Sequence, residues 1–198
     1  MFSLEDLLGK QQGTQAVDQI SQMLGANPTT TNSAIQIALP LILSGLARNA
    51  SQPNGAESLD NALEQDHNGG ILDNLGLLLE QNQQTPQTDG LGILGHIFGQ
   101  KQGAAAQEVS QNTGLDIGQV AKLLMILAPI VMGYLGKQKQ QNNLGADGLS
   151  NLLQEKQQQI QSSGNPMMDI VANFFDKNQD GSAMDDLASM ASNYFSRR

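Results

Sequence analysis

The sequence contains no cysteine and no tryptophan, and it has few aromatic and few basic residues. Its 198 residues include 5 Phe, 2 Tyr and 2 His, and Lys plus Arg total 10 against 19 Asp plus Glu. Without cysteine there is neither a disulfide framework nor thiolate chemistry. The formal net charge of -9 disfavours nucleic acid and anionic membrane surfaces, because both are bound through Lys and Arg. The same charge suits divalent cations or basic partners.

The sequence also shows no pattern that is typical of a targeting or membrane-spanning segment. The N-terminus, MFSLEDLLGKQQG, has no basic region followed by an apolar run, so we expect a cytoplasmic protein. The longest apolar stretch, Leu123 to Gly136, is shorter than the roughly 20 residues that span a bilayer. We interpret it as a buried helix, with membrane insertion as the alternative.

Sequence patterns that mark catalysis are likewise missing. The chain has no H-E-x-x-H, no G-x-S-x-G and no P-loop, which are the patterns of zinc proteases, serine hydrolases and nucleotide-binding enzymes. The two histidines, His67 and His96, have no metal-ligand spacing. We therefore expect a protein that is not an enzyme, and we keep a hydrolase with an unrecognised site as an alternative.

What the chain does contain is an internal repeat. ALPLILSGLARN, starting at Ala38, aligns with LAPIVMGYLGKQ, starting at Leu127, and this alignment pairs Pro40 with Pro129. Shorter matches precede and follow both segments in the same order, which indicates a duplicated module. We expect a first helical repeat at 1–79, a polar loop at 80–90, a second repeat at 91–160, and a C-terminal helix, acidic loop and helix at 161–198.

Each repeat has the pattern of helices. Apolar residues in TQAVDQISQML recur with helical spacing, and Gly25 is placed to end that helix. Asn27 and Pro28 are a cap and a first helical residue for the next helix, in which Pro40 should introduce a kink. No segment alternates with the period of a strand. The predicted fold is all-α, with two pseudo-repeated modules packed on a shared apolar core.

The C-terminal acidic loop is the sharpest candidate site. In DKNQDGSAMDDL, Asp176, Asn178, Asp180 and Gly181 occupy positions one, three, five and six of the EF-hand calcium loop. Calcium takes six to eight oxygen ligands, and alternate side chains in a tight turn converge on one point. Ser182 would supply a backbone carbonyl. These residues predict a calcium site.

The rest of this loop departs from the calcium pattern. Met184 stands at position nine, and Leu187 replaces the bidentate Glu at position twelve. Acidic side chains stand just before position twelve, at Asp185 and Asp186. Calcium binding should therefore be weak, with a dissociation constant of about 10⁻⁴ to 10⁻³ M. The alternative is that Ser182 caps a helix, with the two aspartates stabilising its N-terminus.

A second stretch, EQDHNGGILDNL, aligns with this loop without a gap. It defines a second, weaker candidate site, with oxygen-bearing side chains at Glu64, Asp66, Asn68 and Asp73. His67 falls between the ligand positions in a polar turn, and we expect it to be exposed to solvent.

Several segments together carry a resemblance to a known family: LGANPTTTNSAIQIALPLILSGLARNA, QDHNGGILDNL, ILGHIFGQKQ, LLMILAPIVMGYLGKQK and DKNQDGSAMDDL. Over nearly its whole length the chain resembles a bacterial family catalogued as a domain of unknown function, DUF937. A single module is also similar to the YidB-like all-helical bacterial proteins. The resemblance implies a helical bacterial protein, and it implies no catalytic residues.

The sequence thus predicts a non-catalytic binding or scaffolding protein whose acidic loops bind Ca²⁺ weakly. A metal-free module for self-association or for binding a protein partner is the alternative. We expect a homo-oligomer or a protein partner, no nucleic acid and no membrane.

Overall fold

The computed structural model describes residues 3–73, 88–162, 170–171 and 174–175. Helices are the only regular elements in these ranges, so the predicted all-α class is confirmed. In chain order they are α1 (Leu4–Leu8), α2 (Lys10–Leu24), α3 (Pro28–Ala50), α4 (Gly55–Gln65), α5 (Gly70–Asp73), α7 (Gly90–Phe98), the 3₁₀ helix η1 (Gly99–Lys101), α8 (Gln102–Thr113), α9 (Ile117–Asn142) and α10 (Ala146–Ser162).

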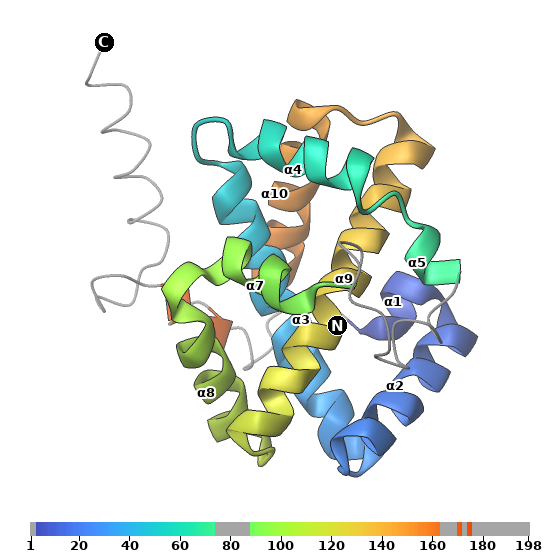
Figure 1. Cartoon of the computed structure of the whole chain (residues 1–198), viewed down its shortest axis with the longest axis vertical. Coiled ribbons are helices and arrows are strands. Elements are labelled where there is room, and N and C mark those ends of the chain that lie inside the picture. The colour runs from blue at the N-terminus through green and yellow to red at the C-terminus, as the bar shows by residue number, and fades with distance from the viewer. Residues whose placement is uncertain (1–2, 74–87, 163–169, 172–173, 176–198) are drawn as a thin grey trace.

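Two long helices, α3 and α9, form the centre of the fold. They pack against each other, and the shorter helices surround them (Figure 1). Ile35, Leu39 and Ile42 of α3 are fully buried, as are Leu123 and Leu127 of α9. Removing each such side chain from water contributes about 1.5–3 kcal/mol. The shared apolar core expected from the sequence is therefore present.

Each central helix contains a proline and continues through it. Pro40 lies within α3 and Pro129 within α9, and both are buried. Proline has no backbone N–H, so each helix lacks one hydrogen bond there, and packing on all sides compensates for that loss. Helix α9 also extends beyond the predicted end at Gly136 to Asn142, because Lys and Gln are good helix formers.

The start of α3 follows the local sequence as predicted. Helix α2 ends at Leu24, and Gly25 adopts a left-handed conformation with φ 64°. The side chain of Asn27 then accepts a hydrogen bond of 2.8 Å from the backbone N–H of Thr30. Pro28 fills the first helical position, where a missing N–H has no effect on the helix.

The start of α9 is built in the same way. Helix α8 ends before Gly114, which is left-handed with φ 80°. Asp116 and Gln119 form a capping box, with bonds of 2.9 and 3.0 Å. Each central helix is also followed by a left-handed asparagine, Asn54 with φ 60° and Asn143 with φ 49°. These residues lead into α4 and α10.

Residues beyond α10 also contact the helical body. The ring of Phe174 packs edge-on against Phe98, at the end of α7, with centroids 5.9 Å apart. The ammonium of Lys101 lies over the same ring at 5.9 Å. Phe98 is buried, so this contact covers the C-terminal end of α7.

The close contact between Gly136 of α9 and the turn at His67 predicts that a larger residue at position 136 destabilises the fold. A Cβ on Gly136 would overlap the carbonyl oxygen of His67. We expect Gly136→Ala to lower the free energy of unfolding by about 1–3 kcal/mol through overpacking, although alanine favours helix over glycine. Urea unfolding followed by circular dichroism measures the change.

Gly103→Ala is the matched control, since a Cβ at Gly103 in α8 meets nothing within 4 Å. This substitution should raise the free energy of unfolding by about 0.4–1 kcal/mol. Equal effects of the two substitutions would contradict the close packing at Gly136.

Candidate functional site

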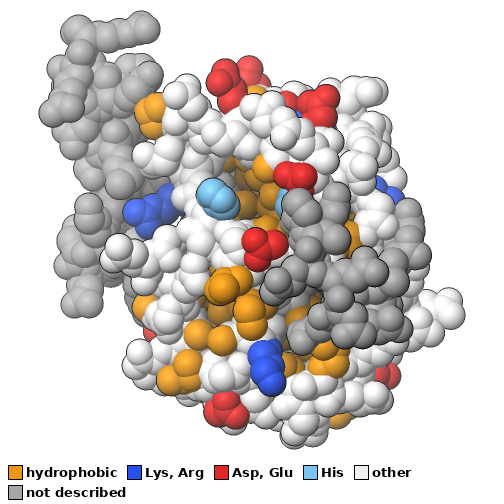
Figure 2. Space-filling view, viewed as in Figure 1, with side chains coloured by type: hydrophobic (Ala, Val, Ile, Leu, Met, Phe, Trp, Pro, Cys, Tyr) orange, Lys and Arg blue, Asp and Glu red, His pale blue; other side chains and the backbone are white. Residues whose placement is uncertain are grey.

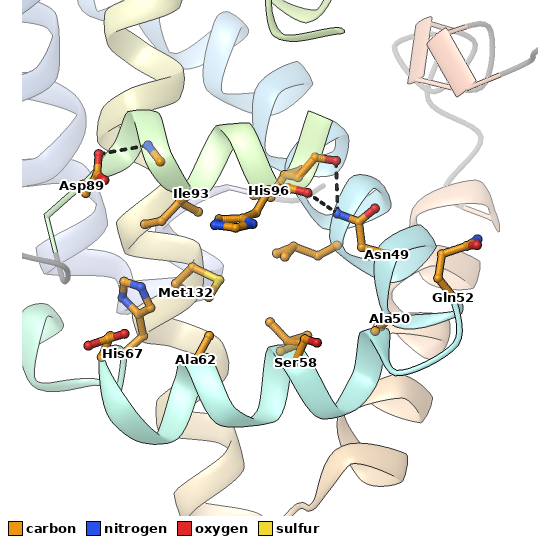
Figure 3. A pocket seen from close by; sticks show the side chains of 16 residues that line it. Asn49, Ala50, Gln52, Ser58, Ala62, His67, Asp89, Ile93, His96 and Met132 are labelled. Atoms are coloured by element: carbon orange, nitrogen blue, oxygen red, sulfur yellow. Dashed lines mark hydrogen bonds between the residues drawn. The ribbon is translucent and has the colours of Figure 1, made fainter. Parts of the chain in front are cut away.

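A pocket lies between the C-terminal end of α3, α4, α7 and α9 (Figure 3). Its volume is about 590 Å³. Its apolar lining consists of Leu46, Ala50, Leu59, Ala62, Ile93, Ile97 and Met132, and its polar lining of Asn49, Gln52, Ser58, Asp66, His67, Asp89 and His96, together with Gly55 and Gly92. Figure 2 shows histidine and acidic side chains around an apolar patch on this face of the molecule.

Helix α7 is fixed to α3 by backbone and side-chain contacts. The amide of Asn49 donates to the carbonyl of His96 at 2.6 Å and to that of Ile97 at 3.2 Å, near the C-terminal end of α7. At the other end, the carboxylate of Asp89 accepts from the N–H of Gly92 at 2.9 Å and caps the helix. The C-terminal end of α7 is thus joined to α3, its N-terminal end is capped, and its inner face forms one wall of the pocket.

Helix α4 forms the opposite wall and is held by a lysine of α9. The ammonium of Lys139 lies 2.9 Å from Asp60 and 3.3 Å from Glu64, and it donates to the carbonyl of Asp60 at 3.2 Å. Burial lowers the pKa of Lys139, but the hydrogen bonds and charges of Asp60 and Glu64 outweigh it, so the pKa lies above its usual value. The lysine stays charged and joins α4 to α9.

His67 is a buried polar residue in the lining of the pocket. It follows α4, its side chain is 5% exposed, and its Nδ1 has no hydrogen-bond partner in the described part of the chain. Burial lowers the pKa of His67, and the charge of Asp66 offsets this only in part. His67 is therefore a neutral imidazole at pH 7. The expectation that it is exposed was wrong, because the turn packs directly on Gly136 of α9.

His96 faces the same pocket from α7. Figure 3 shows its imidazole directed into the space between α7 and α4, above Met132. The protein's only two histidines thus line one cavity although they are distant in sequence. No local spacing signals this pairing, and sequence reasoning missed it.

The four residues of the second acidic stretch have separate places in the fold. Glu64 pairs with Lys139, and Asp66 is the C-cap residue of α4. Asn68 accepts a hydrogen bond of 3.1 Å from the N–H of Gly70, and Asp73 is the last residue of α5. Within the described ranges, no group of three or more His, Cys, Asp or Glu side chains could hold a metal ion.

The first and stronger calcium candidate lies outside the described residues. This applies to Asp176, Asn178, Asp180, Ser182, Asp185 and Asp186. Calcium binding there stays a prediction from the sequence.

The chain belongs to a bacterial family. Residues 6–138 match the family described as "Bacterial protein of unknown function (DUF937)", which confirms the resemblance found in the sequence. Every lining residue of the pocket falls inside the matched range, whereas the C-terminal acidic loop falls outside it. No curated protein and no solved structure matches the chain.

Both central helices are long and apolar enough to cross a membrane by length and composition. The most apolar windows of α3 and α9 are 78% and 61% buried within the fold. Core helices of a folded domain show this combination, so the observation is weak support for a membrane span.

The buried imidazole predicts a pH dependence of stability. Because the pKa of His67 is below 6.5 in the folded chain, the unfolded chain binds more protons as the pH falls from 6.5 towards that lowered pKa. The free energy of unfolding should then fall with decreasing pH, by up to about 1.4 kcal/mol per pH unit. Above pH 6.5 this contribution is complete and constant.

Urea unfolding at several pH values checks this slope. His67→Gln should flatten the profile between pH 6.5 and 5.5, whereas His96→Gln, which removes the other imidazole of the pocket, should keep the part due to His67. A His67→Gln profile parallel to that of the wild-type chain would contradict the assignment.

Proposed function

We propose that this protein is a non-catalytic binding protein and that the pocket between α3, α4, α7 and α9 is its ligand site. One observation carries the proposal: a cavity of about 590 Å³ lies between four helices, with apolar side chains, both histidines and the carboxylates of Asp66 and Asp89 in its lining. A concave space that combines apolar walls with a few polar groups is typical of a ligand site.

The size and composition of the pocket support this proposal. Small-molecule sites are concave, about 300–1,000 Å³ in volume, and mostly apolar with a few polar groups. The pocket also lies within the residues that match the family. A binding role is thus favoured for the part of the chain that defines the family.

The hydrogen bond of Ser58, a serine that lines the pocket, supports a role without catalysis. Ser58 donates its hydroxyl proton to the carbonyl of Asn54 at 2.8 Å. Activation of a serine nucleophile requires a hydrogen bond from its hydroxyl to a base such as histidine. Ser58 has its backbone partner instead, so we propose binding without covalent chemistry.

A neutral apolar probe tests the pocket. We expect 1-hexanol to shift the imidazole C–H proton resonances of His67 and His96 in a saturable way, because both rings line the cavity. Since the chain has 2 histidines, single His→Gln variants assign these signals.

Ala62→Phe should abolish the saturable shift, because Ala62 points into the pocket from α4 (Figure 3). Ala104→Phe, on the exposed face of α8, is the matched control and should bind as the wild-type chain does. Shifts that persist in Ala62→Phe, or that never saturate, would overturn the pocket as a site.

We also propose that the fold consists of two pseudo-repeated modules. The left-handed residues support this: Gly25 and Gly114 precede the two central helices, and Asn54 and Asn143 follow them. In each pair the two residues have the same separation along the chain as Pro40 and Pro129. A duplicated helix pair in which each long helix covers the other accounts for this pattern.

Weak calcium binding at the EF-hand-like C-terminal loop remains our second proposal, supported by the ligand pattern from Asp176 to Asp186 and by the net charge of -9. We expect millimolar Ca²⁺ to raise the thermal midpoint relative to a chelator, because an ion that binds the folded state stabilises it. For dissociation constants of 10⁻⁴ to 10⁻³ M, 10 mM Ca²⁺ corresponds to about 1.4–2.7 kcal/mol.

Asp176→Asn combined with Asp180→Asn should remove the calcium effect. Asp66→Asn, in the second acidic stretch, should keep it, because the described residues around Asp66 form no group that could hold a metal ion. Equal midpoints in calcium and chelator would remove this proposal while leaving the pocket untouched.

We further propose a cytoplasmic location and association with itself or with a protein partner. Burial of most of the two apolar helices supports the location. Exposed apolar side chains at Leu91 of α7 and Ile117 of α9, 59% and 53% exposed, support an interaction surface.

A further inference from the structure

Some hydrogen-bonding groups of the pocket already have partners within the protein, and others have none among the described residues. The N–H groups of Asn49 are committed to the carbonyls of α7, and the hydroxyl proton of Ser58 to Asn54. Two carboxylates of the lining remain as acceptors, that of Asp66 and the Asp89 oxygen that does not cap α7. These oxygens favour a bound molecule that brings hydrogen-bond donors.

The charges of the pocket agree with its hydrogen-bonding groups. Asp66 and Asp89 both line it, whereas none of its described lining residues is Lys or Arg. Arg48 precedes a lining residue on α3 but does not line the pocket, and Lys139 is already paired with Asp60 and Glu64. Neither Asp66 nor Asp89 has an ion pair in the described part of the chain. An anionic ligand would be repelled here, and a cation would be attracted.

The apolar lining sets the second requirement. Leu59 of α4, Ile97 of α7 and Met132 of α9 line the cavity from three helices. Each methylene of a ligand that leaves water for such a surface improves affinity roughly four-fold. Simple inorganic cations gain nothing from these side chains, and the described residues offer no metal-binding group. The fitting ligand is an organic cation with an apolar body.

We propose that the pocket binds a small alkylammonium-type ligand, with its ammonium at the end of the cavity that holds Asp89 and His67 and its apolar body against the side chains of α4, α7 and α9. This rests on the proposed function, which makes the cavity a ligand site. Figure 3 shows Asp89 and His67 towards the same end of the pocket, with Asn49 and Gln52 towards the other. The carboxylates of Asp66 and Asp89 accept its hydrogen bonds and balance its charge.

The two carboxylates of the lining make this chemistry selective. An ammonium has three donors and no acceptor, which complements carboxylate oxygens. A carboxylate ligand of the same length would place negative charge beside Asp66 and Asp89, with no free donor from Asn49. An alcohol of that length would keep the apolar contacts and one donor, but it would not balance the carboxylates.

Three probes of equal chain length test the proposal on the full-length protein at pH 7.5: n-hexylammonium, 1-hexanol and hexanoate. The readout is the dissociation constant from the imidazole C–H resonances of His67 and His96. We expect hexylammonium to bind about ten-fold or more tightly than 1-hexanol, as a charge-assisted hydrogen bond would give. Hexanoate should bind more weakly than the alcohol.

Asp89→Asn removes the charge and keeps an N-cap, because asparagine caps helices as well as aspartate does. It should reduce the preference for hexylammonium over 1-hexanol about ten-fold while leaving 1-hexanol binding within two-fold. Asp18→Asn, on the exposed face of α2, changes the net charge equally and should keep the preference. This pair separates contact in the pocket from the general attraction of an acidic protein.

The outcomes distinguish the preference for an ammonium from the proposed function of the pocket as a ligand site. Tighter binding of hexylammonium that is lost in Asp89→Asn supports it. Binding of 1-hexanol or hexanoate as tight as that of hexylammonium overturns the ammonium preference and leaves the pocket as a ligand site. A preference that falls equally in Asp18→Asn also overturns it. No saturable binding of any probe overturns both the preference and the proposed function.

Discussion

The mutual burial of α3 and α9 is the constraint on which the rest of the structure depends. Both helices are apolar on nearly every side, and their residues dominate the core. Neither could hide that surface alone, and their contact with each other covers only part of it. The shorter helices exist in this arrangement because they cover what remains. A chain with few charges and many polar amides can then expose its short helices to water.

Close contacts at two glycines of the central helices position the surrounding helices and so shape the pocket. Gly45 of α3 contacts Ile97 of α7, and Gly136 of α9 contacts the turn that holds His67. At both places a side chain would keep the covering helix away from the centre. Helices α7 and α4 therefore approach the core at fixed points and stay apart elsewhere. The pocket is the space that these two fixed helices leave between them.

The parts of this structure that could be predicted are those determined by neighbouring residues. The end of α2 at Gly25 and the Asn27 cap of α3 each depend on a few residues, and sequence reasoning placed them correctly. The pocket depends on contacts between residues far apart in the chain, such as Asn49 with His96. The exposure of His67 was mispredicted for the same reason: a polar turn is usually solvated, but this one is pressed against α9. No local pattern contains that information.

The presence of the pocket in this fold is an argument for a functional site. A pocket beside a buried imidazole whose Nδ1 has no hydrogen-bond partner in the described part of the chain is unfavourable, because both lost packing and an unmade hydrogen bond cost free energy. The ion pairs of Lys139 join α4 to α9, and the amide of Asn49 joins α7 to α3, so each wall of the pocket is fixed to a central helix. Where polar contacts fix the walls of a costly space, a functional site is expected.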